Sequence, residues 1–143
     1  MDNAQPLPTE DNRRCPGLRI LLVEDHVVTA ETMATLLRTY GHEVQVALDG
    51  VDALRAAEAE PPDVVLLDIG LPGISGYQVA HQIRQQRTAK RPLLIALTGY
   101  GKNSEDRLQS YEVGIDLHLT KPVAVDELQQ FLERYQNVRK ATP

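Results

Sequence analysis

Apolar and polar stretches alternate regularly along this chain. Runs of about four to eight aliphatic or β-branched residues, bounded by turn formers or charges, are typical of strands buried on both faces of a sheet. The predicted strands are 18–23, 43–47, 64–67, 92–97 and 115–119. The second of them, EVQVA, alternates between polar and apolar residues, as a short half-buried strand does.

Between the predicted strands, apolar residues recur every three or four positions, which predicts amphipathic helices. We expect Asp25 to cap the first helix and Gly41 to end it. Its apolar positions are Ala30, Met33, Ala34, Leu37 and Tyr40. Further helices are predicted at 50–60, 76–86, 103–111 and 125–135. The helix at 103–111 has few bulky apolar residues, so packing is expected to hold it less firmly than the others.

Strands that alternate with helices through short connections form right-handed parallel crossovers, with helices on both faces of one sheet. A closed eight-stranded barrel needs about 250 residues, and this chain has 143. The predicted fold class is therefore α/β, with a doubly wound five-stranded parallel sheet. The periodicity alone does not give the order of the strands.

The length is that of one domain, which we place at residues 18–138. Residues 1–17 contain Pro6, Pro8, Pro16 and Gly17 and almost no bulky apolar residues, so they are predicted to form a flexible tail. Residues 139–143 are predicted to be a short second tail.

The composition is ordinary for a globular protein, with 42% hydrophobic and 24% charged residues. A net charge of −5 argues against direct binding of nucleic acid, which usually needs a basic surface. Cys15 is the only cysteine, so the chain forms neither an internal disulfide nor a cysteine metal site. With no apolar stretch near the ~20 residues that span a bilayer and no signal peptide, we expect a cytoplasmic protein without a membrane partner.

Chemically reactive side chains follow four of the predicted strands. Glu24 and Asp25 come after the first, Asp68 after the third, Thr98 after the fourth and Lys121 after the fifth. Because the carboxyl ends of parallel strands lie at one edge of the sheet, these side chains are expected to converge in one crevice. Each residue alone has an ordinary explanation, such as a helix cap or a surface charge. Their joint placement indicates a site.

The expected chemistry of this crevice follows from its charges. Three neighbouring carboxylates repel one another unless a cation lies among them. Oxygen ligands suit a hard cation such as Mg²⁺ better than Zn²⁺. Mg²⁺ together with Lys121 would stabilise a phosphoryl group during its transfer, and a carboxylate can act as the nucleophile and form an aspartyl-phosphate.

The motifs LLVEDH, VVLLDIGLPGISGYQVA, IALTGYG and LHLTKPV, in this order and spacing, resemble the receiver domain of two-component response regulators. The resemblance covers residues 18 to about 135. It implies a flavodoxin-like sheet with the strand order 2-1-3-4-5. TGYG and LHLTKPV resemble the receivers of hybrid histidine kinases in particular, which favours a role in a multistep phosphorelay.

The resemblance also implies roles for the residues of the crevice. Asp68 resembles the phosphoacceptor, which attacks a phosphohistidine on a histidine kinase or a histidine phosphotransfer protein. Asp25 and Asp68 resemble ligands of Mg²⁺, with the carbonyl group of Gly70 as a third ligand and Glu24 acting through water. The implied cofactor is therefore Mg²⁺.

Thr98 resembles the switch hydroxyl of the family, and Lys121 the lysine that binds a phosphoryl oxygen. The Lys121–Pro122 peptide bond is implied to be cis. The chain departs from the family at His118, where receivers usually carry Tyr or Phe. Of the other histidines, His26 is expected at the rim of the site, whereas His42 and His81 show no ligand spacing.

The predicted function is that of a single-domain response regulator receiver. It is expected to accept a phosphoryl group on Asp68 in a Mg²⁺-dependent reaction, and to promote its own phosphorylation and dephosphorylation without being a turnover enzyme. The signal would leave through a phosphorylation-dependent protein surface at the fourth helix, the fifth strand and the fifth helix. The downstream partner is unknown.

Three alternatives stay open at this point. A pseudo-receiver would bind partners without phosphorylation. A phosphatase of the aspartate-nucleophile type would carry a D-x-D pattern, but Gly70 stands at its second aspartate position. A flavin carrier would need a Gly-, Ser- and Thr-rich phosphate cradle after the first strand, where this chain has the acidic sequence EDH.

Overall fold

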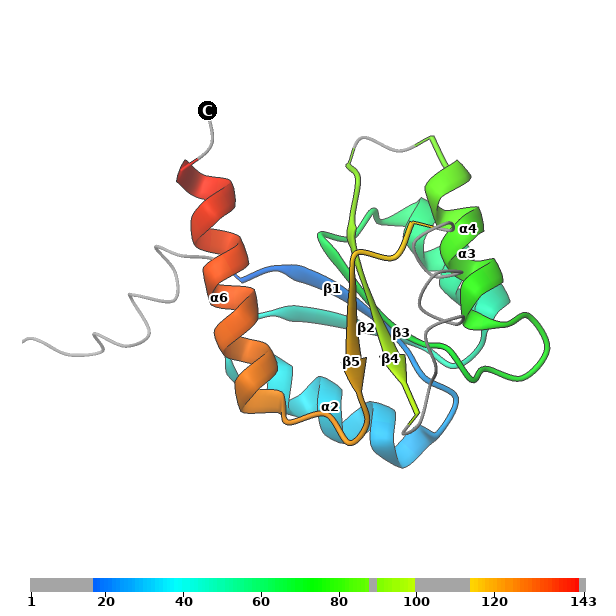
Figure 1. Cartoon of the computed structure of the whole chain (residues 1–143), viewed down its shortest axis with the longest axis horizontal. Helices are drawn as coiled ribbons and strands as arrows, with labels where there is room; N and C mark the ends of the chain where they lie inside the picture. Colours follow the sequence, from blue (N-terminus) through cyan, green and yellow to red (C-terminus); the bar gives the residue numbers. More distant parts are fainter. Residues whose placement is uncertain (1–16, 88–89, 100–113, 142–143) are drawn as a thin grey trace, which may run out of the picture.

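The computed structural model describes residues 17–87, 90–99 and 114–141. It contains a sheet of five parallel strands in the order β2-β1-β3-β4-β5 (Figure 1). The strands are β1 (Arg19–Val23), β2 (Glu43–Ala47), β3 (Val64–Asp68), β4 (Leu93–Thr98) and β5 (Leu117–Thr120). The predicted doubly wound sheet and its strand order are confirmed.

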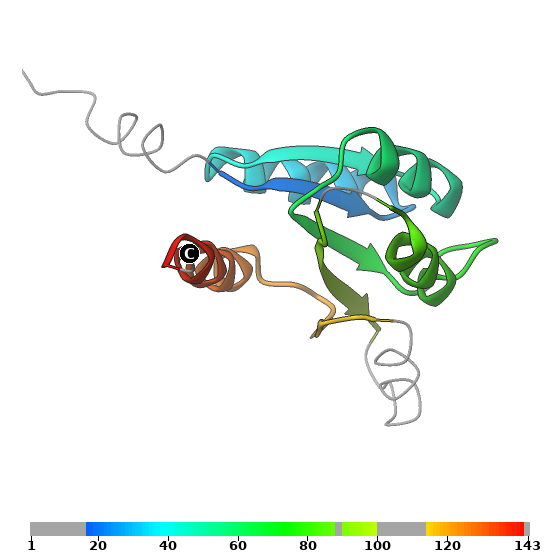
Figure 2. The ribbon, with the colours of Figure 1, turned by 90° about the horizontal axis from the view of Figure 1, so that it is seen from above.

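The described helices cover both faces of the sheet. They are α2 (Val27–Thr39), α3 (Gly50–Ala59), α4 (Gly76–Gln85) and α6 (Val125–Ala141). Figure 2 shows the sheet between α6 on one side and α3 with α4 on the other. None of the described helices is both long and apolar enough to cross a lipid bilayer. The helix predicted at 103–111 and most of the predicted amino-terminal tail lie outside the described residues.

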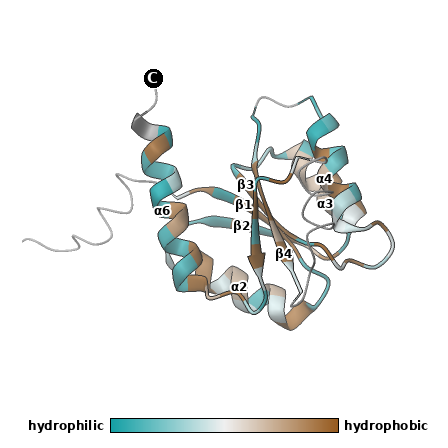
Figure 3. Ribbon diagram, in the orientation of Figure 1, coloured by the Kyte–Doolittle hydropathy of each residue, from teal (hydrophilic) through white to brown (hydrophobic). Residues whose placement is uncertain are grey.

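Strand β3 lies in the centre of the sheet, and all five of its residues are buried. Because side chains alternate along a strand, Val65 and Leu67 join the core under α3 and α4, whereas Val64 and Leu66 join the core under α2 and α6. Burial of each such side chain stabilises the fold by roughly 1.5–3 kcal/mol. The apolar strands stand out in the hydropathy colouring of Figure 3. The buried central strand therefore ends at Asp68.

The first helix begins one residue later than predicted. The amino-terminal cap of α2 is His26, whose Nδ1 accepts a hydrogen bond from the Thr29 N–H at 3.3 Å. The prediction that Asp25 caps this helix is therefore wrong, and its carboxylate is left available for other interactions. At the other end, Tyr40 follows the last helical turn and is 42% exposed, so its predicted place on the apolar face is also wrong.

A buried histidine joins α6 to the sheet. Nδ1 of His42 accepts a hydrogen bond from the Leu18 N–H at 3.0 Å, so Nε2 carries the ring proton and donates to Gln129 Oε1 at 2.6 Å. His42 is only 6% exposed. The sequence analysis found no role for His42, because its partner on α6 lies far along the chain.

The carboxyl end of α6 is also tied to the sheet. The helix continues to Ala141, so the predicted end at 135 is too early. Arg139 Nη2 lies 3.4 Å from Asp63 Oδ1, and the Arg139 guanidinium lies 5.5 Å from the ring centre of Tyr135. These contacts hold the last turns of a helix whose exposed face is largely polar.

Asp63 precedes β3 at the end of the sheet opposite to Asp68. Its carboxylate accepts hydrogen bonds from the Arg19 N–H at 2.8 Å and from Lys90 Nζ at 3.0 Å. Burial by itself raises the pKa of Asp63, but these donors and the charges of Lys90 and Arg139 outweigh it, so the pKa lies below its ordinary value. Asp63 is thus a structural carboxylate.

We expect Asp63→Asn to lower the free energy of unfolding by roughly 1–3 kcal/mol near neutral pH. Because the folded state depresses the pKa of Asp63, the stability that it contributes is present above about pH 4 and is lost as the pH falls through the folded value. The difference between the two proteins should therefore shrink in strong acid. Urea unfolding near neutral pH and at about pH 3 measures this difference in stability. The control is Asp52→Asn, at an exposed position of α3. A difference that does not depend on pH would contradict this assignment.

Candidate functional site

The sheet brings the reactive residues predicted from the sequence to one edge. Glu24 and Asp25 directly follow β1, Asp68 ends β3, Thr98 ends β4, and Lys121 directly follows β5. All strands are parallel, so all of these positions lie at the carboxyl edge of the sheet.

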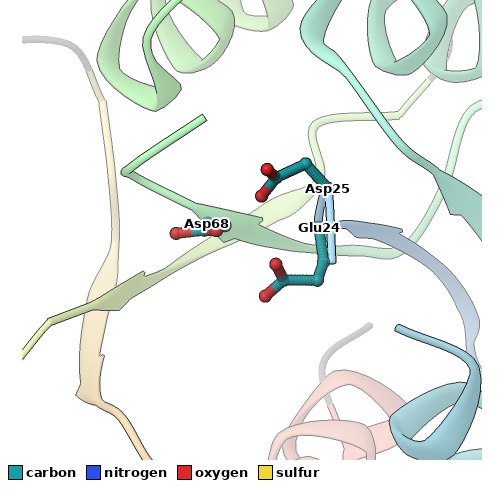
Figure 4. Close-up of side chains that lie close together, drawn as sticks. All are labelled: Glu24, Asp25 and Asp68. Atoms are coloured by element: carbon teal, nitrogen blue, oxygen red, sulfur yellow. The ribbon is translucent and has the colours of Figure 1, made fainter. Parts of the chain in front are cut away.

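Three carboxylates form an acidic cluster at this edge. One carboxylate oxygen each from Glu24, Asp25 and Asp68 lies within 4.8 Å of the others. Figure 4 shows the side chains of Glu24 and Asp25 on the side of β1 that faces Asp68. Glu24 and Asp68 are only 3% and 6% exposed, whereas Asp25 is exposed. The cluster is therefore buried at Glu24 and Asp68 and open to solvent at Asp25.

Lys121 bridges two members of the acidic cluster. Its Nζ lies 3.1 Å from Asp68 Oδ1 and 3.3 Å from Glu24 Oε1. The Lys121 N–H donates to the Thr98 carbonyl group at 2.8 Å, which continues the pairing of β4 with β5 up to the lysine. The Lys121–Pro122 peptide bond is cis, as the resemblance implied.

The pKa shifts of the site follow from burial and from these contacts. Burial raises the pKa of Glu24 and the charge of Asp68 adds to this effect, while the His26 N–H and Lys121 oppose it. Burial lowers the pKa of Lys121, but its hydrogen bond to Asp68 and the charges of Asp68 and Glu24 outweigh burial and raise it. Lys121 therefore stays charged and is the cation that partly neutralises the cluster.

The donor set of the cluster fits a hard divalent cation. Three carboxylates and one ammonium group leave an excess of negative charge in a partly buried space. The ligand atoms are all oxygens, and one carboxylate is open to solvent, which suits an ion such as Mg²⁺ that keeps several of its waters. Glu24, Asp25 and Asp68 are the residues that would hold it.

Gly70 and Thr98 flank the phosphoacceptor candidate. The Gly70 N–H donates to Asp68 Oδ1 at 3.0 Å, and a Cβ at position 70 would lie 3.7 Å from the same oxygen. Glycine therefore leaves this side of the carboxylate uncovered. Thr98 is 4% exposed, and its hydroxyl group donates to the Leu119 carbonyl group of β5 at 3.4 Å.

A groove of about 750 Å³ opens beside the site, between α2 and the loop after β5. Glu24, His26 and Lys121 line it together with apolar residues such as Val28, Leu36 and Val123. His26 thus lies at the rim of the site, as expected. The sequence analysis missed the groove, although Val28 breaks the polar face of the helix and is 69% exposed.

The strand order 2-1-3-4-5 and the acidic cluster with a lysine at the carboxyl edge agree with the family that the sequence motifs resemble. Residues 20–133 match the family model of the response regulator receiver domain. The chain belongs to this family. Receiver domains are known to bind Mg²⁺ in their acidic active site and to interact with histidine kinases or phosphotransfer proteins.

Curated relatives include sensor histidine kinases and transcription regulators. The chain is 33% identical over 145 residues to the sensor histidine kinase RcsC of Escherichia coli K12, covering 98% of this chain and 15% of RcsC. It is 37% identical over 115 residues to the transcriptional regulatory protein TcrA of Mycobacterium tuberculosis H37Rv, covering 80% of this chain and 44% of TcrA. The chain thus spans less than half the length of these relatives.

Solved structures show the same fold. The receiver domain of the sensor histidine kinase PA1611 from Pseudomonas aeruginosa PAO1 is 36% identical, with a TM-score of 0.75 over 85% of this chain and 98% of that one. That structure holds a magnesium ion in its active site cleft. A CheY-like receiver from Methanospirillum hungatei JF-1 is 25% identical, with a TM-score of 0.79 over 89% of this chain and 99% of that one.

We expect Lys121→Met to lower the free energy of unfolding of the metal-free protein by about 1–3 kcal/mol, because two buried carboxylates lose their cation. The loss is smaller than for a fully buried ion pair, because the ammonium group is partly exposed to solvent. Mg²⁺ should then raise the melting temperature more in the variant than in the parent, since Lys121 no longer competes for the carboxylates. Thermal unfolding with and without Mg²⁺ measures both effects.

The matched control is Lys90→Met, which removes an ion pair with Asp63 at the opposite end of β3. This variant should lose stability but keep the parent's response to Mg²⁺. An equal response to Mg²⁺ in all three proteins would show that Lys121 does not share carboxylates with the metal.

Proposed function

We propose that this receiver domain accepts a phosphoryl group from a phosphohistidine onto Asp68, in a reaction that requires Mg²⁺. The observation that carries the proposal is the placement of Lys121 Nζ at 3.1 Å from Asp68 Oδ1, beside a cluster of three carboxylates. Asp68 thus has the Lys121 ammonium group at contact distance, and the carboxylates of Glu24 and Asp25 beside it as ligands for a second cation. A phosphoryl group in transfer needs positive charge on both sides.

In the proposed reaction, an oxygen of Asp68 attacks phosphorus, the phosphorus–nitrogen bond of the phosphohistidine breaks, and the imidazole leaves with the electron pair. Asp25 and Asp68 would hold Mg²⁺ directly, with the Gly70 carbonyl group as a third ligand and Glu24 through water. The bound metal would neutralise phosphoryl oxygens. Lys121 would exchange its contact with Asp68 for a phosphoryl oxygen.

The proposed switch involves Thr98. Its hydroxyl group now donates to the Leu119 carbonyl group of β5. In the phosphorylated protein it would donate to a phosphoryl oxygen of Asp68, so the contact with β5 would be exchanged. His118 lies on β5 next to Leu119, and β5 is followed by α6. The signal would leave through β5, α6 and the helix predicted at 103–111, as a change of a protein-binding surface.

The groove beside the site is the proposed docking place of the phosphohistidine donor. It is continuous with the site, because Glu24 and Lys121 line both. Its walls are largely apolar, with Val28 and Leu36 of α2 exposed at 69% and 42%. A donor that covers these side chains would bring its histidine to Asp68 and exclude water from the transfer.

Membership of the receiver family argues against the phosphatase and the flavin carrier and leaves the phosphorylation-independent pseudo-receiver as the alternative. A module that binds partners without phosphate has no need for a buried acidic cluster, which costs electrostatic energy. The presence of Glu24, Asp25, Asp68 and Lys121 in one place supports the phosphoacceptor instead. As a stoichiometric acceptor that promotes its own phosphorylation and dephosphorylation, the domain would act as a switch and not as a turnover enzyme.

With Mg²⁺ and acetyl phosphate, we expect the parent to gain one phosphoryl group, and Asp68→Asn to gain none, because the amide lacks the nucleophilic oxygen. Intact-mass spectrometry measures the modification. Asp63→Asn is the matched control, since it makes the same change at the opposite end of β3, and it should be phosphorylated like the parent. Equal phosphate uptake by Asp68→Asn would refute the proposal, as would a parent that takes up none.

We expect Val28→Glu to slow phosphotransfer from the cognate kinase, once phosphotransfer profiling has identified it, by about tenfold or more, because a charge would be buried in an apolar contact. Its reaction with acetyl phosphate should be unchanged, since Val28 touches the groove and not the phosphoacceptor. Val51→Glu, which is similarly exposed on α3, is the control. A slower reaction with both donors would place Val28 in the chemical step, contrary to the docking proposal.

A further inference from the structure

The first residue of α4 lies directly against the main chain of the phosphoacceptor. A Cβ built at Gly76 would lie 2.6 Å from the Asp68 carbonyl oxygen and 2.6 Å from the Ile69 Cα. The Gly76 N–H donates to the Ile69 carbonyl group at 3.1 Å. Here a missing side chain allows a helix to touch the end of the central strand, backbone to backbone.

We propose that Gly76 is a positioning residue for the phosphoacceptor: the absence of a side chain at this position sets the place of the Asp68 main chain, and hence the distance of its carboxylate from Lys121, Glu24 and Asp25. This inference rests on the proposed function of Asp68. The two atoms nearest to a side chain at position 76 are main-chain atoms of Asp68 and Ile69, so the residue would act on the site through the backbone.

A methyl group at position 76 would force a movement, because its two nearest neighbours are backbone atoms that cannot rotate away. The shortest ordinary van der Waals contact is 3.4 Å, so the gap must open by roughly 0.8 Å. Helix α4 is fixed on its own side: Ser75 and Gln78 form a capping box, and Val79, Ala80 and Ile83 are buried. Beyond Ile69, whose N–H donates to the Leu97 carbonyl group at 3.2 Å, the chain leaves the sheet at exposed Gly70, so the movement is expected at this end of β3.

The displacement would act on the chemistry of Asp68. Its Oδ1 accepts from the Gly70 N–H at 3.0 Å and lies 3.1 Å from Lys121 Nζ, so the carboxylate is held from both sides at contact distance. Misplacement of a reacting group by about 1 Å can reduce a rate by up to about a hundredfold. We therefore expect a change at Gly76 to alter metal binding and phosphorylation together.

Two other glycines provide matched controls away from the site. Gly50 is the first residue of α3, as Gly76 is of α4, and its Cβ would lie 2.8 Å from the Val79 side chain. Gly17 lies before β1, at the opposite edge of the sheet, and its Cβ would lie 2.1 Å from the Gly41 carbonyl oxygen. Alanine at position 17 would meet backbone atoms at the opposite edge of the sheet. Alanine at position 50 would meet only side chains, among them Val79 of α4, and would press on this helix without touching the Asp68 main chain.

The experiment compares Gly76→Ala, Gly50→Ala and Gly17→Ala in the full chain. Calorimetric titration with Mg²⁺ gives the affinity of the acidic cluster, mass spectrometry gives the rate of phosphorylation by acetyl phosphate, and thermal unfolding gives the stability. We expect Gly76→Ala to lose about tenfold in both Mg²⁺ affinity and phosphorylation rate. The two control variants should lose stability but stay within about twofold of the parent in both site measurements.

A folded Gly76→Ala protein that matches the controls in Mg²⁺ affinity and rate would overturn the inference. If Gly76→Ala does not fold, Ser75→Ala combined with Gln78→Ala takes its place, because it loosens the start of α4 without a clash. A fall in Mg²⁺ affinity with this variant supports the inference, and an unchanged affinity overturns it. A parent protein that is never phosphorylated would instead refute the proposed function.

Discussion

The structure depends on one electrostatic constraint, the enforced proximity of three carboxylates at the carboxyl edge of the sheet. Two like charges about 4 Å apart repel by about 4 kcal/mol at the effective dielectric constant near a protein surface. Glu24 and Asp68 cannot separate, because each continues a fully buried strand segment in the middle of the sheet. The burial of apolar residues in β1 and β3 thus holds together charges that would otherwise move apart, and Lys121 offsets only part of their repulsion.

The two aspartates that border β3 show how surroundings decide the role of a carboxylate. Asp63 accepts from a backbone N–H and lies beside Lys90 and Arg139, so its charge is satisfied and its pKa is lowered. Asp68 shares one lysine with Glu24 and has further acids beside it. The first carboxylate fastens elements together. The second has one shared lysine for two carboxylates, so the cluster keeps an excess of negative charge that a metal ion can neutralise.

Much of this protein was determined by its sequence. Runs of apolar residues predicted every described strand to within a few positions, because a strand buried on both faces needs apolar residues at successive positions. The motifs that contain Asp25, Asp68, Thr98 and Lys121 predicted the strand order through their resemblance to receivers. Residues that follow parallel strands must share an edge, so the convergence of Asp68 and Lys121 also followed from the sequence.

Only the tertiary structure decided the features that join distant segments. His26 caps α2 in place of Asp25, because the cap depends on where the strand before it ends in space. His42 bonds to Gln129, which is 87 residues away, and the contact of Gly76 with the Asp68 main chain depends on how α4 docks. A periodic pattern records which face of an element is buried. It carries no information about the atoms that it meets there, because these are set by the packing of all elements together.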